Sequence, residues 1–200
     1  PTKDILYVKA DHYFKFNNET LWHSAGVAVP VFSLRTEDGF GVGEFSDIKK
    51  LGDWANDAKL SVIQILPIND TTANYTWTDS YPYAAISVYA LHPQYLSIEK
   101  LEYVLPKKLV KEYQDKKAEL NALSLIDYEQ MISGKWKFAK AVFEENQEAI
   151  LKDKNFKKFI KDNEEWLMPY SAFCVLRDKY KTPNFNDWKT HKKFVAGKVA

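Results

Sequence analysis

The sequence predicts an α/β fold that opens with a strand–helix–strand unit and continues into a helical half. Two nearly continuous apolar runs lie within about 45 residues of chain, and apolar residues recur at helical spacing between them. Five of the seven glycines precede residue 53, whereas helical periodicity dominates from residue 106 onward. Strands and loops are therefore expected in the first half and helices in the second.

The composition excludes several classes of protein. Apolar residues make up 46% and charged residues 28% of the 200 residues, which is typical of a soluble domain. A net charge of +1 argues against general nucleic-acid binding. Since no apolar run approaches 18 residues, no membrane span is predicted. The single cysteine, Cys174, predicts no internal disulfide, and no signal peptide precedes the first strand, which favours a cytoplasmic protein.

Each element of the opening unit has a local cause. Ala25 to Leu34 is apolar enough for a strand buried on both faces, with a bulge or strand end at Pro30, which lacks a ladder N–H. Ser46 is the expected N-cap of a helix that runs to Lys59. Residues 62–66 form a second buried strand, parallel to the first, that Pro67 stops. The apolar stripe of the helix comprises Ile48, Leu51, Trp54, Ala55 and Ala58.

The flanking segments are predicted from the same periodicities. Short strands are expected at 5–9 and 13–16. One long helix is expected over 127–151, and a second helix follows an N-cap at Asn163. The mixed Lys and Glu residues of this half indicate solvent-facing helix surfaces. The two inward faces comprise Met131, Ile132, Ala139, Val142 and Phe143, and Trp166, Tyr170, Phe173, Cys174 and Arg177.

The most informative segment is the long loop over 69–87, which follows the second strand. Parallel sheets and barrels keep their binding sites at the carboxyl ends of their strands. Sugar sites combine rings, which stack on C–H faces, with polar groups, which bind hydroxyls. The loop is rich in aromatic rings, so we expect it to be ordered. It holds the run Trp77-Thr78-Asp79-Ser80-Tyr81-Pro82-Tyr83.

Other chemistry has weaker support. Gly39, Gly41 and Gly43 lack the spacing of a dinucleotide-binding loop, so they indicate positive φ or close approach of the backbone. The four histidines have no metal-ligand spacing, and no metal or cofactor is expected. Paired carboxylates would suit a glycosidase, but Asp70 could equally form an Asx turn. The candidate carboxylates are Glu44, Asp70 and Asp79.

Several ordered motifs then carry a family resemblance over about residues 24–190. The first four are Gly26-Val27-Ala28-Val29-Pro30-Val31-Phe32-Ser33-Leu34-Arg35, Gly41-Val42-Gly43-Glu44-Phe45-Ser46-Asp47, Gln64-Ile65-Leu66-Pro67-Ile68-Asn69-Asp70 and Asp79-Ser80-Tyr81-Pro82-Tyr83. The later ones are Trp166-Leu167, Pro169-Tyr170, Ala172-Phe173-Cys174 and Leu176-Arg177-Asp178. The sequence resembles the 4-α-glucanotransferases of glycoside hydrolase family 77, the amylomaltases and disproportionating enzymes. Thr71, the extra Tyr81 and the run Ala90-Leu91-His92-Pro93 are similar to the plant cytosolic disproportionating-enzyme branch.

The resemblance implies an α/β fold with a partial (β/α)8 TIM barrel, namely its first two strands and first helix, and an inserted α-helical subdomain. The lead-in over 1–22 would be the tail of a preceding starch-binding module, the barrel start would cover 23–98, and the helical subdomain 99–200. Such enzymes transfer glucanosyl units between α-1,4-linked glucans, such as maltose and maltodextrins, with retention.

The family's catalytic carboxylates match no position in this sequence, so none is assigned and the chain alone is expected to be inactive. Tyr83 matches the family tyrosine that stacks near the sugar at the cleavage point. Its neighbours Trp77, Asp79, Ser80 and Tyr81 are the other expected substrate contacts.

Two alternatives remain open, a non-catalytic α-glucan-binding module and an α-glucan hydrolase on a related barrel. The chain lacks an initial Met and ends within a pattern, so we expect it to be an excised piece. Two strands without their barrel partners would leave bare edges. We therefore expect either self-association or helices folded over the exposed face.

Overall fold

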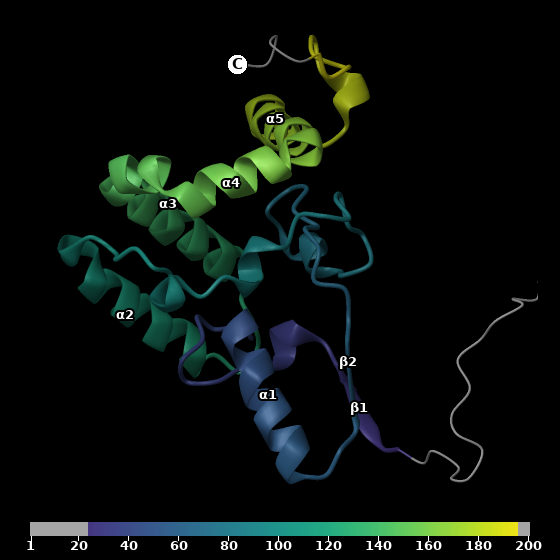
Figure 1. The fold of residues 1–200 in the computed structure, drawn as a ribbon, viewed down its shortest axis with the longest axis vertical. Helices are drawn as coiled ribbons and strands as arrows, with labels where there is room; N and C mark the ends of the chain where they lie inside the picture. Colours follow the sequence, from purple (N-terminus) through teal and green to yellow (C-terminus); the bar gives the residue numbers. More distant parts are fainter. Residues whose placement is uncertain (1–23, 196–200) are drawn as a thin grey trace, which may run out of the picture.

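The computed structural model describes residues 24–195 (Figure 1). It has a small parallel sheet with one helix beside it, a long loop, and four further helices, as the predicted α/β class with a helical half requires. The predicted strands at 5–9 and 13–16 lie outside the described residues. The principal elements are β1 (Gly26–Val29), α1 (Phe45–Asp57), β2 (Val62–Ile65), α2 (Lys107–Ala122), α3 (Tyr128–Lys152), α4 (Lys154–Asp162) and α5 (Glu164–Tyr180).

The predicted strand–helix–strand unit is confirmed, but its first strand is shorter than expected. β1 and β2 are parallel, with Gly26 opposite Val62 and Val29 opposite Ile65. β1 ends at Val29, directly before Pro30, because proline cannot donate to the ladder; of the predicted bulge and strand end, the structure has the strand end. A single 3-10 turn at Val31–Ser33 follows it.

Burial on both faces of the strands is the prediction that the structure overturns. Side chains of β1 alternate between exposed and half-buried, and three of the four in β2 are exposed. Val62 is 40% exposed to solvent, and Ile65 is 36% exposed. The helices α2 to α5 lie beyond the loop end of the unit and do not fold over the sheet (Figure 1). Among the described residues, no layer therefore covers both faces of the strands.

Helix α1 starts two residues earlier than predicted. Glu44, not Ser46, is the N-cap, and the Glu44 backbone N–H donates to the Asp47 carboxylate over 2.8 Å. A carboxylate in the first turn also faces the positive end of the helix dipole. Ala55 from the predicted stripe is buried, but Trp54 is 51% exposed.

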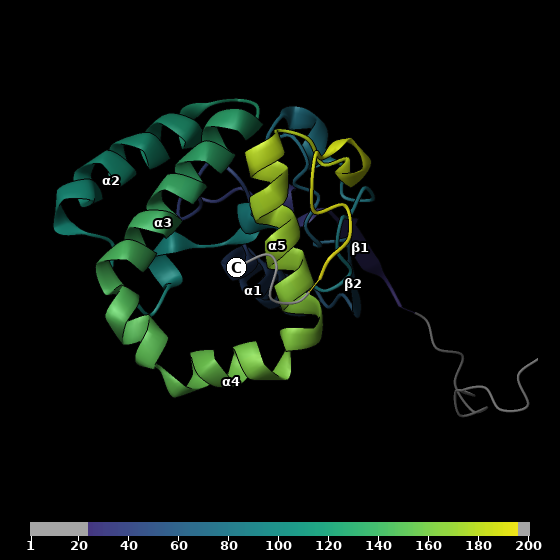
Figure 2. The same ribbon diagram turned by 90° about the horizontal axis from the view of Figure 1, so that it is seen from above.

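The main core lies where the loop that holds Gly39, Gly41 and Gly43, here called the glycine loop, meets α2 and α3 (Figure 2). Phe40 is fully buried and stacks on Tyr113, with ring centroids 5.2 Å apart. Phe138 meets both rings edge-on. Stacked and edge-to-face pairs stabilise beyond their buried area. Met131 and Ile132, predicted on the inward face of α3, belong to this core, and the Asp127 side chain caps that helix.

A buried ion pair fastens α3 to the start of α1. The Lys135 ammonium donates to the Glu44 carboxylate over 2.6 Å and to the carbonyls of Gln94 and Leu96 over 2.6 and 2.8 Å. Both charged side chains are 1% exposed. Burial lowers the pKa of Lys135, and the Glu44 charge opposes that shift. Because three acceptors surround the ammonium, the buried charge is fully paired.

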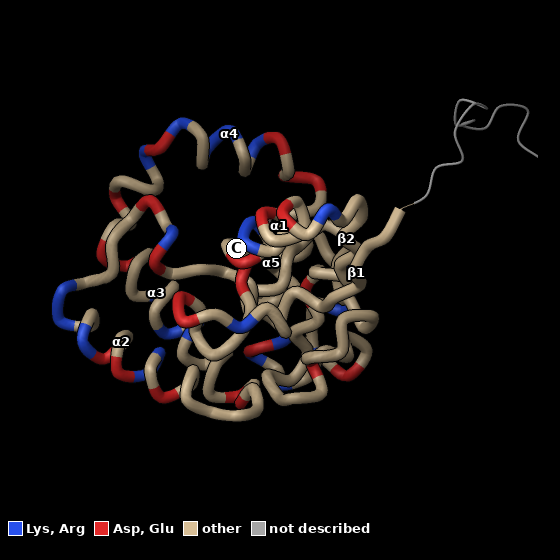
Figure 3. Tube along the Cα trace, turned by 90° about the horizontal axis from the view of Figure 1, so that it is seen from below, with Lys and Arg blue, Asp and Glu red and all other residues tan. Residues whose placement is uncertain are grey.

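The surfaces of the helical half carry both signs of charge. Lys and Arg alternate with Asp and Glu along α2, α3 and α4 (Figure 3). Several pairs lie one helical turn apart, such as Lys152 with Glu148 and Lys158 with Asp162. This confirms solvent-facing helix surfaces. In the range 24–195, no helix combines the length and apolarity that crossing a bilayer requires.

Candidate functional site: an aromatic loop after the second strand

The loop that follows β2 is closed at its base. Asn69 and Leu91 form an antiparallel bridge. The Asp70 backbone N–H donates to the Ala90 carbonyl over 2.8 Å, and the His92 N–H donates to the Ile68 carbonyl over 2.9 Å. The loop is therefore ordered and sits at the carboxyl end of a parallel strand, as predicted.

Asp79 organises the loop from within. Its carboxylate is buried and accepts the backbone N–H groups of Ala73, Asn74 and Tyr75 over 2.9, 2.8 and 2.7 Å. The Thr71 hydroxyl donates to the Asp79 carbonyl. These contacts bend residues 73–75 around one carboxylate, so the predicted substrate residue Asp79 is engaged by the backbone.

The aromatic residues of the predicted site, in contrast, face outward. Trp77 is 69% exposed, and Tyr81 and Tyr83 are each 61% exposed. The rings of Tyr81 and Tyr83 lie 5.6 Å apart between centroids and are tilted by 53°. The Ser80 hydroxyl donates to the Trp77 carbonyl over 2.6 Å within the 3-10 turn. Three exposed rings thus lie along one loop, and we call them together the aromatic patch. Tyr81 and Tyr83 lie against each other, whereas Trp77 borders a separate hollow beside residues 123–129.

Asp70 has the structural role that the Asx alternative predicted. Its Oδ1 accepts the Thr72 backbone N–H over 2.9 Å and the Thr72 hydroxyl over 2.6 Å. Its Oδ2 accepts the Tyr170 hydroxyl of α5 over 2.5 Å. With Asp70 and Asp79 inside the loop and Glu44 paired to Lys135, all three candidate carboxylates are buried and hydrogen-bonded.

Helix α5 contributes a contact that the sequence did not identify as part of the site. The buried Arg177 donates through Nη1 to the Thr72 carbonyl over 2.5 Å and through Nη2 to the Tyr75 hydroxyl over 2.6 Å. The Tyr75 hydroxyl also lies 3.1 Å from the Asp178 carboxylate. Helical spacing placed Arg177 and Tyr170 on one face of α5, but not against this loop.

His92 supports the far end of the loop as a neutral ring. Nδ1 accepts the Gln94 backbone N–H over 3.0 Å, so the ring proton is on Nε2, which faces the Tyr128 hydroxyl at 3.1 Å. Burial lowers the pKa of His92 to about 4, against the opposing charges of Asp70 and Asp79. His92 therefore acts as a buried structural residue.

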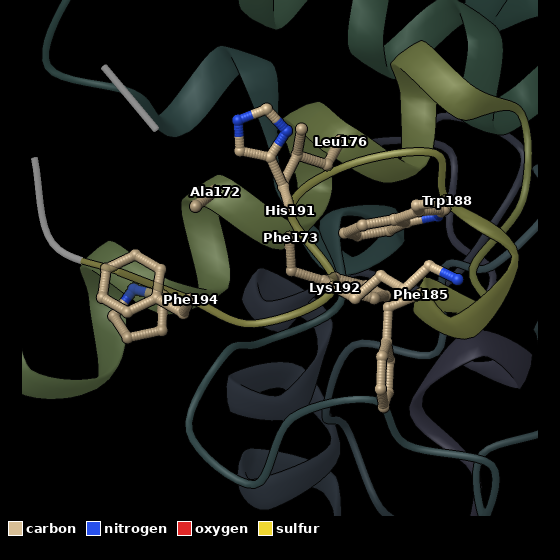
Figure 4. A pocket seen from close by; sticks show the side chains of 9 residues that line it. Ala172, Phe173, Leu176, Phe185, Trp188, His191, Lys192 and Phe194 are labelled. Carbon is tan, nitrogen blue, oxygen red and sulfur yellow. The ribbon is translucent and has the colours of Figure 1, made fainter. Parts of the chain in front are cut away.

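Two cavities adjoin α5. One, of about 680 Å³, lies between the loop, α3 and α5 and is bordered by Tyr75, Trp136 and Cys174. Burial raises the pKa of the Cys174 thiol, which keeps it neutral. The other, of about 190 Å³, is lined mostly by apolar side chains such as Phe173 and Trp188 and by no carboxylate (Figure 4). The larger cavity is also lined by the carboxylates of Asp70, Glu129 and Asp178, each of which accepts a hydrogen bond from the protein.

The glycine loop has a packing role, not a phosphate-binding one. Gly41 has a φ of 74°, and a Cβ there would lie 2.6 Å from the Leu120 Cβ. The Gly41 N–H donates to Asn121 over 2.9 Å, and the Gly43 N–H donates to the Phe32 carbonyl over 2.9 Å. Positive φ and close approach are thus confirmed.

Comparison with known proteins gives a consistent result. A family model described as 4-alpha-glucanotransferase, glycoside hydrolase family 77, matches residues 29–199. The chain is 41% identical over 181 residues to "4-alpha-glucanotransferase DPE2" of Oryza sativa subsp. japonica, covering 90% of this chain and 19% of the rice protein.

Bacterial relatives give similar coverage. "4-alpha-glucanotransferase" of Chlamydia muridarum is 35% identical over 175 residues, and that of Chlamydia caviae is 32% identical over 164 residues. Each match covers 82% of this chain and 31% or 30% of the relative. The chain thus spans from about a fifth to just under a third of the length of these relatives.

Proposed function

Because the chain belongs to the 4-alpha-glucanotransferases of glycoside hydrolase family 77, we propose that it forms part of an enzyme that transfers glucanosyl units between α-1,4-linked glucans with retention. The observation that carries this proposal to a site is the exposed aromatic patch of Trp77, Tyr81 and Tyr83. Its rings sit on a closed loop at the end of a parallel strand, where barrels bind their ligands.

The proposed architecture is the beginning of a (β/α)8 barrel. β1, α1 and β2 would be its first two strands and first helix, within residues 23–98, and residues 99–200 would form the helical subdomain. The parallel pairing and the exposed apolar strand residues, Val62 among them, support this assignment, since barrel strands are covered on both sides.

The proposed division of labour leaves the bond-breaking carboxylates to another part of the polypeptide. Retaining transfer needs a carboxylate nucleophile and a carboxylic acid/base that reach the sugar. Glu44, Asp70 and Asp79 are buried and committed to protein hydrogen bonds, which supports their exclusion. The aromatic patch would hold the glucan chain and so contribute to its affinity. We propose maltose and maltodextrins as the substrates. We propose the cytoplasm as the location of the enzyme.

A product ladder tests this proposal. The full-length enzyme and the 200-residue chain are each given maltotriose, and the sugars are resolved by size. We expect longer and shorter glucans from the full-length enzyme and no change with the chain alone. Shorter sugars only would indicate a hydrolase, and activity of the chain alone would place the carboxylates here. Glucan binding without any product from either protein would indicate a binding module.

The same assay tests the aromatic patch through Tyr83→Ala in the full-length enzyme. We expect catalytic efficiency on maltotriose to fall by about tenfold to a hundredfold, because burying a large apolar side chain against a ligand contributes about 1.5–3 kcal/mol. Phe185→Ala is the matched control, since Phe185 is 48% exposed and lies outside the loop. Equal effects of the two substitutions would remove the patch from the site.

A further inference from the structure

We infer that Arg177 is a positioning residue, which fixes the aromatic loop from helix α5 and thereby sets the affinity for glucan. The inference rests on the proposed function, in which the loop binds α-glucan. It adds a residue of the helical half, far from the loop in sequence, to the determinants of that site.

The first step is the contact itself. Arg177 is 3% exposed, and each of its guanidinium nitrogens has an acceptor. Nη1 bonds the Thr72 carbonyl, Nη2 bonds the Tyr75 hydroxyl, and Nε bonds the Asp178 carboxylate over 2.9 Å. The guanidinium carbon also lies 5.0 Å from the centre of the Tyr75 ring. A planar fork is needed to satisfy acceptors in different directions, so lysine would not replace it.

The second step is the conformation that this contact holds. Tyr75 has a φ of 60°, in the left-handed region that bulky residues seldom occupy. Such a residue stays there only when its surroundings fix both ends. Arg177 holds the side chain of Tyr75, and the Asp79 carboxylate holds its backbone N–H at 2.7 Å.

The third step connects the contact with the exposed rings. Asp79 lies in the 3-10 turn Trp77–Ser80, and its carboxylate receives the N–H groups of residues 73–75. A displacement of Tyr75 therefore moves Asp79, and with it Trp77 and the adjoining Tyr81. The Trp77 backbone N–H is held separately by Glu129 over 2.8 Å, so the loop would shift without unfolding.

The position of Arg177 favours a change in the loop over a loss of the fold. It is absent from the main core of Phe40, Tyr113 and Phe138. It borders the cavity of about 680 Å³, so water can reach the groups that it now satisfies.

The experiment compares Arg177→Gln with Lys179→Gln in the full-length enzyme. Lys179 is an exposed cation on the same helix, and replacing it leaves the contacts between Arg177 and the loop unchanged. We expect Arg177→Gln to raise KM for maltodextrin about tenfold with kcat within twofold, because uniform binding is lost. Amide hydrogen exchange of residues 72–83 should become faster in Arg177→Gln only. Lys179→Gln should match the wild type in both measurements.

A second variant covers the case in which Arg177→Gln does not fold. Tyr75→Phe removes only the hydroxyl that Arg177 bonds, and it should raise KM and loop exchange in the same direction. Combined with Arg177→Gln, its effect should be less than additive, since both remove one contact.

Two results separate the possible failures. If the wild type transfers glucan, and a folded Arg177→Gln or Tyr75→Phe enzyme keeps its KM and loop exchange, the positioning role is overturned and the proposed function stands. If the wild type neither binds nor transfers glucan, the proposed function fails, and the inference about affinity fails with it, whatever the loop exchange shows.

Discussion

Single residues of the same chemical type have different roles in this chain, and burial separates them. Asp70 and Asp79 lie in one loop, yet each gathers a different set of donors, and neither presents a free carboxylate. Tyr75 and Tyr83 lie in that loop too, but burial raises the pKa of Tyr75 to about 12, whereas Tyr83 is 61% exposed. The sequence named Asp70, Asp79 and Tyr83 as candidates, but it could not tell which of their side chains are buried.

At the residue scale, the lowered pKa of His92 predicts that the free energy of unfolding depends on pH. Its pKa falls from 6.5 in the unfolded chain to about 4 in the fold, mainly through burial; Asp70 and Asp79 oppose the shift, and Lys135 adds to it. The unfolded chain therefore binds more protons between these values. The His92 contribution is fully present above pH 6.5 and is lost as pH falls towards 4, by about 3 kcal/mol.

His92→Asn provides the comparison for urea unfolding at several pH values. Asparagine keeps an acceptor for the Gln94 N–H but does not titrate. We expect a smaller loss of unfolding free energy between pH 6.5 and pH 4 than in the wild type. Identical slopes for the two proteins would contradict the assignment of a buried, neutral His92.

At the scale of secondary structure, the sequence predicted which segments are helices or strands better than it predicted the residues at which they begin and end. Helix α3 starts one residue after Asp127, the predicted start, because that side chain caps it by accepting the Gln130 N–H over 3.0 Å. β1 ends at Val29, and the missing N–H donor of Pro30 explains why. The burial of the strands was wrongly predicted, because an apolar run shows what a strand can bury and not what covers it.

Packing between elements gives a prediction on the glycine loop. Gly41→Ala should lower the free energy of unfolding by about 2–4 kcal/mol, since the new Cβ meets Leu120 at positive φ. Gly52→Ala in α1 is the matched control: no atom lies within 4 Å of its Cβ position, so stability should rise by about 0.5–1 kcal/mol. Denaturant titration of both variants checks the signs; a neutral Gly41→Ala would contradict the close approach to α2.

At the scale of the whole molecule, the small sheet stands out because several of its apolar side chains are exposed. Its apolar side chains stay accessible, because α2 to α5 pack on the loop end (Figure 1). The expectation that helices fold over the sheet is therefore wrong for residues 24–195. Self-association of the 200-residue chain stays a prediction, since exposed edges and apolar faces favour pairing.

Light scattering after size exclusion tests this prediction. We expect a concentration-dependent mass for the chain, and Val62→Lys should reduce it by placing a charge on the sheet. Val110→Lys is the matched control, because Val110 is 44% exposed on α2 and Val62 is 40% exposed. A monodisperse monomer that binds little apolar dye would contradict self-association.

The sequence by itself determined the strand–helix–strand order, the parallel strand pair, the ordered aromatic loop, the helical second half and the family. These follow from local periodicity, turn chemistry and short motifs, all of which depend only on residues that are close together in the sequence. Only the tertiary structure decided that Arg177 and Tyr170 hold the loop, that Lys135 pairs with Glu44, and that Asp79 faces inward. Those contacts join segments far apart in sequence, and their partners depend on how the helices pack, which no local pattern specifies.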